Sequence, residues 1–185
     1  RVRRQRQMCI RDRVWKDGSK SSAKVVTGNA ESISAENWQG KSYSAANKVN
    51  IADYFEENTQ YHYQYTDNYT GDDSVWSAEY DYTTKATDKF SVILTGDPQV
   101  GASGSSSDKS ANDASVARDA YNWNKTMQQA LKTCPDASFL LSAGDQINQS
   151  GAAKDDDKKT RESEYAGYLY PSVFRSLPIA AIIGN

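Results

Sequence analysis

Short segments of alternating apolar and polar residues, separated by turn-forming residues, run from residue 14 to about residue 84. This pattern is typical of an all-β unit, with strands expected within residues 23–30, 42–51, 59–67 and 74–84. The alternation is strictest in "TQYHYQYTD", where Tyr61, Tyr63 and Tyr65 share one face and His62 lies on the other. We expect His62 to be a solvent-facing strand residue rather than a ligand.

After the polar connector "TTKATDK" the period of the pattern changes. "FSVILTGD" (residues 90–97) is a short apolar run, which predicts a strand buried on both faces. Apolar residues then recur at helical spacing over 114–133, with Asn112 or Asp113 as the expected N-cap and Pro135 as the stop. The apolar stripe of this helix consists of Val116, Ala120, Trp123, Met127, Ala130 and Leu131.

Two further apolar strands are expected at residues 137–145 and 177–185. Between them "KDDDKKTRESE" (154–164) predicts a solvated surface loop, and a short helix is expected over 163–170. Residues 89–185 therefore follow the order β-α-β-α-β, which predicts parallel neighbouring strands joined by crossover helices.

The composition narrows the range of sites that the chain can form. Its 185 residues are enough for one domain or two small ones, and no apolar run approaches the ~20 residues of a membrane span. The only two cysteines, Cys9 and Cys134, form neither a disulfide framework nor a CxxC metal site. The single histidine, His62, leaves little imidazole for zinc or acid–base chemistry.

Charge is concentrated in the first thirteen residues, which carry six arginines and one aspartate. The whole chain carries −2 and this segment +5, so residues 14–185 carry −7, which argues against nucleic acid as a partner there. The segment resembles translated sequencing-library adaptor more than a nucleic-acid arm or a signal peptide. We therefore expect residues 1–13 to be non-native or disordered and take the fold to begin at Val14.

Polar residues follow each of the three expected apolar strands, in "GDPQ", "GDQIN" and "GN". Because the carboxyl ends of parallel strands meet at one edge of a sheet, four side chains are expected to converge there. These are Asp97, Gln99, Asp145 and Asn185. Carboxylate and amide oxygens without thiols suit oxygen-preferring divalent cations, so the sequence predicts a metal site at this edge.

Two parts of the sequence resemble known families. "FEENTQY" resembles the tyrosine corner of fibronectin type III-like sandwiches, in which the hydroxyl of Tyr61 would bond to upstream backbone. The three strand-end motifs, in this order, resemble the first three motifs of calcineurin-like metallophosphoesterases, which include the purple acid phosphatases. The implied fold is mixed: a partial all-β sandwich over 14–84, then the first half of an α-β-β-α layered phosphoesterase domain over 89–185.

The resemblance implies two divalent metal ions (Fe, Zn or Mn) and a phosphate-ester substrate. Asp97 and Gln99 would bind the first metal, Asp145 would bridge the two, and Asn185 would bind the second. A metal-activated hydroxide would then attack phosphorus in line. The resemblance also implies an extracellular or cell-envelope protein, and it leaves the oligomeric state open.

The sequence departs from the family pattern at three places. Gln99 replaces a histidine, Asn148 stands where purple acid phosphatases have a metal-binding tyrosine, and the chain ends at Asn185, before the histidine expected next. The chain is therefore expected to be a fragment, truncated at both ends, with no catalytic residue of its own and no activity.

Three other interpretations stay open. The Gly-Asp pairs are also common strand-to-loop turns. "GDPQVGASGS" is a glycine-rich stretch that would suit a nucleotide phosphate, although it matches neither G-x-G-x-x-G nor the Walker pattern. The tyrosine-rich β unit would also suit a non-catalytic adhesion or carbohydrate-binding protein.

Overall fold

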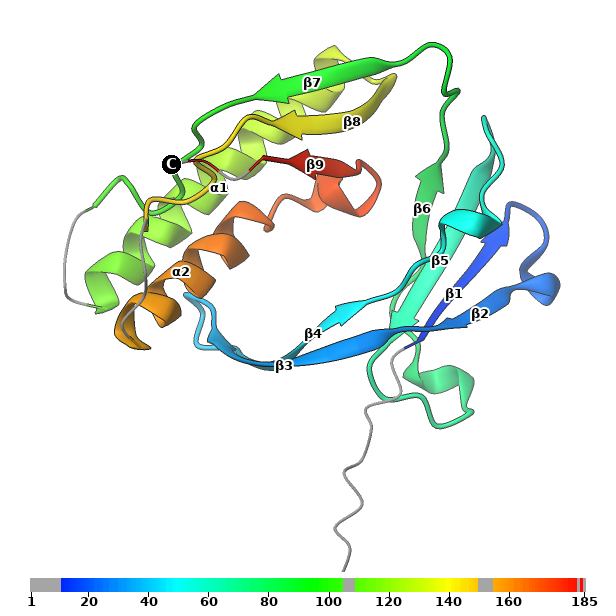
Figure 1. Cartoon of the computed structure of the whole chain (residues 1–185), viewed down its shortest axis with the longest axis horizontal. Coiled ribbons are helices and arrows are strands. Elements are labelled where there is room, and N and C mark those ends of the chain that lie inside the picture. The colour runs from blue at the N-terminus through cyan, green and yellow to red at the C-terminus, as the bar shows by residue number, and fades with distance from the viewer. Residues whose placement is uncertain (1–10, 105–108, 150–154, 183, 185) are drawn as a thin grey trace, which may run out of the picture. The chain divides into compact units, whose positions relative to one another are not determined.

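The computed structural model of the protein describes residues 11–104, 109–149, 155–182 and 184 (Figure 1). The chain divides into two compact units. The β unit comprises Arg1–Ile33 and Ala45–Thr87, and the α/β unit comprises Ser34–Ser44 and Asp88–Asn185. The division near residue 87 lies close to the expected one, but the inclusion of residues 34–44 in the α/β unit was not expected.

The β unit is built on an antiparallel sheet with the strand order β2-β1-β5-β6. Its strands are β1 (Arg11–Lys16), β2 (Lys24–Thr27), β5 (Gln60–Thr66) and β6 (Tyr80–Thr83). A separate two-stranded sheet pairs β3 (Asn29–Glu36) with β4 (Ser42–Lys48). Short 3-10 turns occur at η1 (Lys20–Ser22), η2 (Ala52–Tyr54) and η3 (Asp73–Val75).

Residues 34–44 comprise the end of β3, the start of β4 and the turn between them. They belong to the α/β unit, and Trp38 of the turn contacts that unit's hydrophobic core. The Trp38 ring also meets Tyr170 edge-on at 5.5 Å. Asn37 is buried and shapes the turn, since its Oδ1 accepts the backbone N–H groups of Gln39 and Lys41, each at 3.0 Å.

Tyr61 confirms the expected bond to upstream backbone. Its hydroxyl accepts the backbone N–H of Glu56 at 2.8 Å, and its ring packs edge-on against Phe55 at 4.7 Å. Tyr61 is buried, whereas Tyr65 on the same strand face is 51% exposed. The tyrosine stripe therefore passes from the core to the surface along β5.

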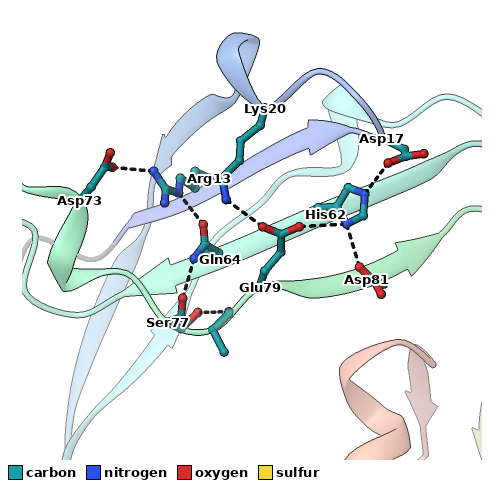
Figure 2. A network of polar contacts seen from close by, with 10 residues as sticks. Arg13, Asp17, Lys20, His62, Gln64, Asp73, Ser77, Glu79 and Asp81 are labelled. Carbon is teal, nitrogen blue, oxygen red and sulfur yellow. Dashed lines mark hydrogen bonds and ion pairs between the residues drawn. The ribbon is translucent and has the colours of Figure 1, made fainter.

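His62 is not solvent-facing, so that expectation is wrong. Its side chain is only 13% exposed and stacks on Trp15 of the neighbouring strand at 5.8 Å. Its ring nitrogens lie 3.0 Å from Asp17 Oδ1 and 2.7 Å from Asp81 Oδ1 (Figure 2). Burial lowers the pKa of His62, but the bonds to Asp17 and Asp81 and the nearby negative charge outweigh it, so the pKa is raised overall.

Residues 11–13 are also not a disordered extension. Arg11, Asp12 and Arg13 begin β1 and pair with β2 on one side and β5 on the other. Arg13 Nε donates to Gln64 Oε1 at 2.8 Å, and its guanidinium lies over the Trp76 ring at 4.6 Å. The expected boundary at Val14 falls within this strand; residues 1–10 lie outside the described residues.

The α/β unit has the predicted β-α-β-α-β order, with a parallel sheet β7-β8-β9. Figure 1 shows the three strands side by side. The elements are β7 (Ser91–Thr95), α1 (Lys109–Thr133), β8 (Ala137–Ser142), α2 (Asp155–Tyr168), η4 (Ser172–Arg175) and β9 (Ile179–Ala181). None of the helices in the described part of the chain is long and apolar enough to cross a membrane.

Both helices begin earlier than the sequence predicted. Helix α1 starts at Lys109, so Asn112 and Asp113 lie within it instead of capping it, because no glycine or proline interrupts residues 109–133. Helix α2 starts at Asp155, so most of the expected surface loop is helical. Glu164, at the overlap of the expected loop and the expected short helix, is only 1% exposed.

The two faces of the sheet differ. One face packs Ile93, Leu140 and Ile179 against α1 and α2, which confirms the predicted α1 stripe as a core contact. On the opposite face Leu94 is 68% exposed, and Phe90 and Ile182 are also exposed. The apolar run of β7 predicted burial on both faces. Among the described residues only one face is covered, so this prediction is wrong for them.

Candidate metal centre at the strand ends

The loops that follow β7 and β8 lie side by side and are joined through their backbones. Asp97 N–H donates to the Gly144 carbonyl at 3.3 Å, and Gln99 N–H donates to the Asp145 carbonyl at 2.9 Å. Two further bonds of 3.1 Å, Val100 N–H to Gln146 and Asn148 N–H to Val100, continue the pairing. The first two sequence motifs therefore meet at one edge of the sheet, as expected.

The end of β9 meets the same place. A Cβ atom added at Gly184 would overlap the Asp145 carboxylate, so the backbone before residue 185 lies directly against that side chain. Asn185 itself lies outside the described residues. Asp145 is thus bonded through its backbone carbonyl to the loop that follows β7, and its side chain lies against the backbone that follows β9.

The backbone at this edge is strained. Asp97, Gln99 and Asp145 have φ angles of 59°, 38° and 48°, in the left-handed region that non-glycine residues rarely adopt. Such conformations cost roughly 1–3 kcal/mol each and persist only where surrounding contacts hold them, which happens mainly at functional sites. In the described part of the chain only one other non-glycine residue, Asn58, has a positive φ.

The donor set is rich in oxygen but small. Asp97 and Gln99 are exposed and Asp145 is half-buried, so the described part of this edge carries two carboxylates and one amide. The described residues contain no group of three or more His, Cys, Asp or Glu side chains that could hold a metal ion. The set therefore fits part of the shell of one oxygen-preferring divalent cation, and does not by itself make a two-metal centre.

Gln146 is a buried polar residue that the sequence reasoning passed over. Its Nε2 donates to the Ser142 hydroxyl at 3.0 Å and to the Ile182 carbonyl at 2.7 Å. It thereby ties the loop that follows β8 to the end of β9. Its place directly after Asp145 was visible in the sequence, but its bond to the carbonyl of Ile182, 36 residues away, was not.

Two helix carboxylates support the same loops and were also missed. Asp119 of α1 accepts backbone N–H groups from the β7 loop, and Glu164 of α2 accepts them from the β8 loop. A sequence signal existed for Glu164: it falls at a core position of α2, beside the buried Gly167 and Tyr168. Asp119 likewise adjoins the buried Ala120 in the stripe of α1.

The glycine-rich stretch after β7 is not free to hold a phosphate. The N–H groups of Val100 and Ala102 bond to carbonyls, and those of Gly101 and Ser103 bond to Asp119. A phosphate cradle needs such N–H groups to be available, and a carboxylate already occupies two of them. Residues 105–108 lie outside the described residues.

The structure is similar to that of a purple acid phosphatase from the seeds of yellow lupin (Lupinus luteus), with 15% sequence identity and a TM-score of 0.58. The match covers 96% of this chain and 30% of the lupin chain, so the chain spans less than a third of that protein. No family model matches the sequence, and neither does any curated protein. At this identity the similarity establishes a shared fold.

Proposed function

We propose that the chain is part of a metal-dependent phosphoesterase related to the purple acid phosphatases. The observation that carries this proposal is the joining of the Asp97–Gln99 loop to the Gly144–Asp145 loop at the end of a parallel sheet. The similarity to a phosphatase fold supports it, because the match covers 96% of this chain and so includes both the β unit and the α/β unit.

The roles of the donors follow from their places. Asp97 and Gln99 belong to the loop after β7 and would bind one cation. Asp145 belongs to the loop that follows the central strand of the three. Its backbone bonds to the β7 loop and its carboxylate lies against Gly184, which suits a carboxylate that bridges two cations. Asn185, next to Gly184, would bind the second cation.

Divalent cations held there would supply a bound hydroxide nucleophile and positive charge for the phosphate oxygens. The contribution of this chain is to hold Asp97 and Asp145 at a fixed separation through the paired loops. The described donors are too few for a dinuclear centre, so we expect the 185-residue chain alone to be inactive. In an α-β-β-α layered domain, two sheets pack face to face between layers of helices. We propose that in the complete protein the exposed sheet face that carries Leu94 packs against such a second sheet.

The β unit, with its tyrosine-corner bond, would correspond to a fibronectin type III-like domain that precedes the catalytic domain. An extracellular or cell-envelope location belongs to this proposal as well.

The test is divalent-ion-dependent hydrolysis of an aryl phosphate by the complete protein. Asp145→Asn should lower kcat/KM by at least about 100-fold, since a bridging carboxylate is lost. The matched control, Asp136→Asn, changes an exposed aspartate just before β8 and should leave turnover unchanged. Equal turnover in Asp145→Asn and the wild type would refute the bridging role.

A second candidate, glycan binding by the β unit, has one observation in its favour. The exposed ring of Tyr65 lies parallel to that of Tyr80, with centroids 6.0 Å apart and an interplanar angle of 7°. A pocket of about 280 Å³ adjoins it, lined by Asp12, Asn47, Val49, Tyr65 and Thr66. Oligosaccharide binding that is lost in Tyr65→Ser, without divalent-dependent hydrolysis, would favour this candidate.

A further inference from the structure

The carboxyl group of Glu164 is buried between the two loops of the proposed cation site. Glu164 is 1% exposed, and its Oε2 accepts the backbone N–H of Gln149 at 2.7 Å, with the N–H of Asn148 also bonded to the group. On its other side, a Cβ atom at Gly101 would overlap the same carboxyl group. Glu164 therefore touches the β8 loop through Gln149 and the β7 loop through Gly101.

Gly101 is suited to this contact in two ways. Its φ of 104° lies in a region that other residues rarely adopt, and the missing side chain leaves the space that the carboxyl group fills. The N–H of Gly101 points to Asp119 Oδ2 at 2.9 Å, and the N–H of Ser103 donates to the same oxygen at 3.2 Å. Each helix thus contributes one carboxylate, Asp119 from α1 and Glu164 from α2, that accepts backbone N–H groups of these loops.

These contacts lie two to four residues from the proposed metal ligands. Gln99 precedes Gly101 by two residues, and Asp145 precedes Gln149 by four. Between the ligands and Glu164 runs the backbone pairing of Val100 with Gln146 and Asn148. This pairing forms a continuous backbone path from the contacts of Glu164 to the ligand residues, whose backbone is strained.

We propose that Glu164 is a positioning residue for the cation site, which sets the spacing between the Asp97–Gln99 loop and the Asp145 loop. This inference rests on the proposed function, because it takes Asp97, Gln99 and Asp145 as the cation ligands. Glu164 itself is too deeply buried to reach the cation or a substrate.

The ionisation of Glu164 supplies an independent signal of this contact. Burial raises the pKa of Glu164 to about 7, against the opposing effect of the Gln149 and Asn148 N–H groups, and the negative charge of Asp119 adds to the rise. Among the described residues, Asp119 on α1 is the ionisable group whose charge acts on Glu164. The amide signals of Asn148 and Gln149 should therefore titrate with a midpoint near pH 7 in the wild-type chain.

The experiment compares three ¹⁵N-labelled chains: wild type, Glu164→Gln and Glu162→Gln. The last changes a neighbouring, partly exposed glutamate of the same helix and serves as the matched control. The Gln149 amide titration should be lost in Glu164→Gln and kept in Glu162→Gln. In Asp119→Asn its midpoint should move to lower pH, because the repelling charge is removed.

Mn²⁺ is then added, and paramagnetic broadening of the amides near Asp97 and Asp145 is followed. Glu164→Gln should need about 10- to 100-fold more Mn²⁺ than the wild type, the range found when groups that orient metal ligands are removed. Equal Mn²⁺ dependence in all three chains would overturn the positioning role and leave the cation site standing. An absence of broadening in every chain, with the Gln149 titration intact, would instead refute the cation site.

If Glu164→Gln fails to fold, the titrations of the wild type and of Asp119→Asn provide the test. A Gln149 amide that does not titrate near pH 7 in the wild type would refute the buried contact.

Discussion

The His62 cluster in the β unit and the strand-end site in the α/β unit differ in what they contain and in how they are built. The His62 cluster has more ionisable groups: His62, Asp17, Glu79, Asp81 and Lys20 lie in one connected network (Figure 2). Its members lie in or beside paired strands of ordinary geometry. Among the described residues the strand-end site has two carboxylates and an amide, and they stand on strained backbone supported by buried polar side chains.

If the function proposed above holds, the number of charged groups is a poor guide to the functional site in this chain. In the His62 cluster each ring nitrogen already has a carboxylate partner, so the network stabilises the packing of β1, β5 and β6. At the strand ends the protein bears an energetic cost to hold three oxygen-bearing side chains in unusual conformations. The following predictions test this contrast.

Gly184→Ala should have the largest effect. The new Cβ would overlap the Asp145 carboxylate and displace it, so Mn²⁺ affinity should fall by about 10- to 100-fold. Water-proton relaxation during a Mn²⁺ titration measures this affinity. Gly96→Ala is the control, since its nearest neighbour, Ala143 Cβ, would lie 3.9 Å away. Equal losses in both variants would mean that the Asp145 contact is not the cause.

Gln146→Ala should destabilise the α/β unit by about 1–3 kcal/mol, because the buried Ser142 hydroxyl and the Ile182 carbonyl each lose a donor. Urea unfolding followed by tryptophan fluorescence measures the free energy of unfolding. Gln128→Ala, at an exposed position of α1, should change it by less than about 0.5 kcal/mol. A wild-type value for Gln146→Ala would show that the tie between the two strand ends contributes nothing.

Tyr61→Phe should destabilise the β unit by about 1 kcal/mol, the usual contribution of one hydrogen bond, here the one from the Glu56 N–H. Chemical denaturation is again the measurement. Tyr54→Phe, at an exposed tyrosine, should have no measurable effect. If Tyr61→Phe matches Tyr54→Phe, the tyrosine-corner bond does not stabilise the unit.

His62→Gln should have the smallest effect, below about 1 kcal/mol, because the partner carboxylates are largely exposed. The pKa of His62 is raised in the folded chain, so its contribution is complete below its ordinary pKa and is lost as pH rises through the raised value. The raised pKa of Glu164 acts in the same direction. The loss of stability with rising pH should therefore be shallower in His62→Gln, without vanishing. A pH slope identical to that of the wild type would contradict the contribution of His62. A change in Mn²⁺ affinity in His62→Gln would contradict the placement of the cation site at the strand ends.

The sequence predicted the features that depend on local pattern. The apolar runs and the α1 stripe gave the β-α-β-α-β order and the parallel strands, which the structure confirms. The Gly-Asp pairs located the edge where the loops of Asp97 and Asp145 meet. Their roles as metal ligands, and that of Asn185, stay predictions.

The features that the sequence did not predict depend on distant partners. His62 is covered because Asp17 and Asp81, 45 and 19 residues away, reach it from neighbouring strands. Glu164 is buried although its segment is highly charged, because α2 turns that one carboxylate toward the N–H groups of the β8 loop. The apolar run of β7 indicated burial on both faces, yet Leu94 is exposed among the described residues.

The most direct measurement is anomalous diffraction from a crystal of the protein grown with Mn²⁺. We predict an anomalous peak within coordinating distance of the side-chain oxygens of Asp97 and Asp145, and none beside His62. A peak at the cluster formed by His62, Asp17 and Asp81, with none at the strand ends, would contradict it.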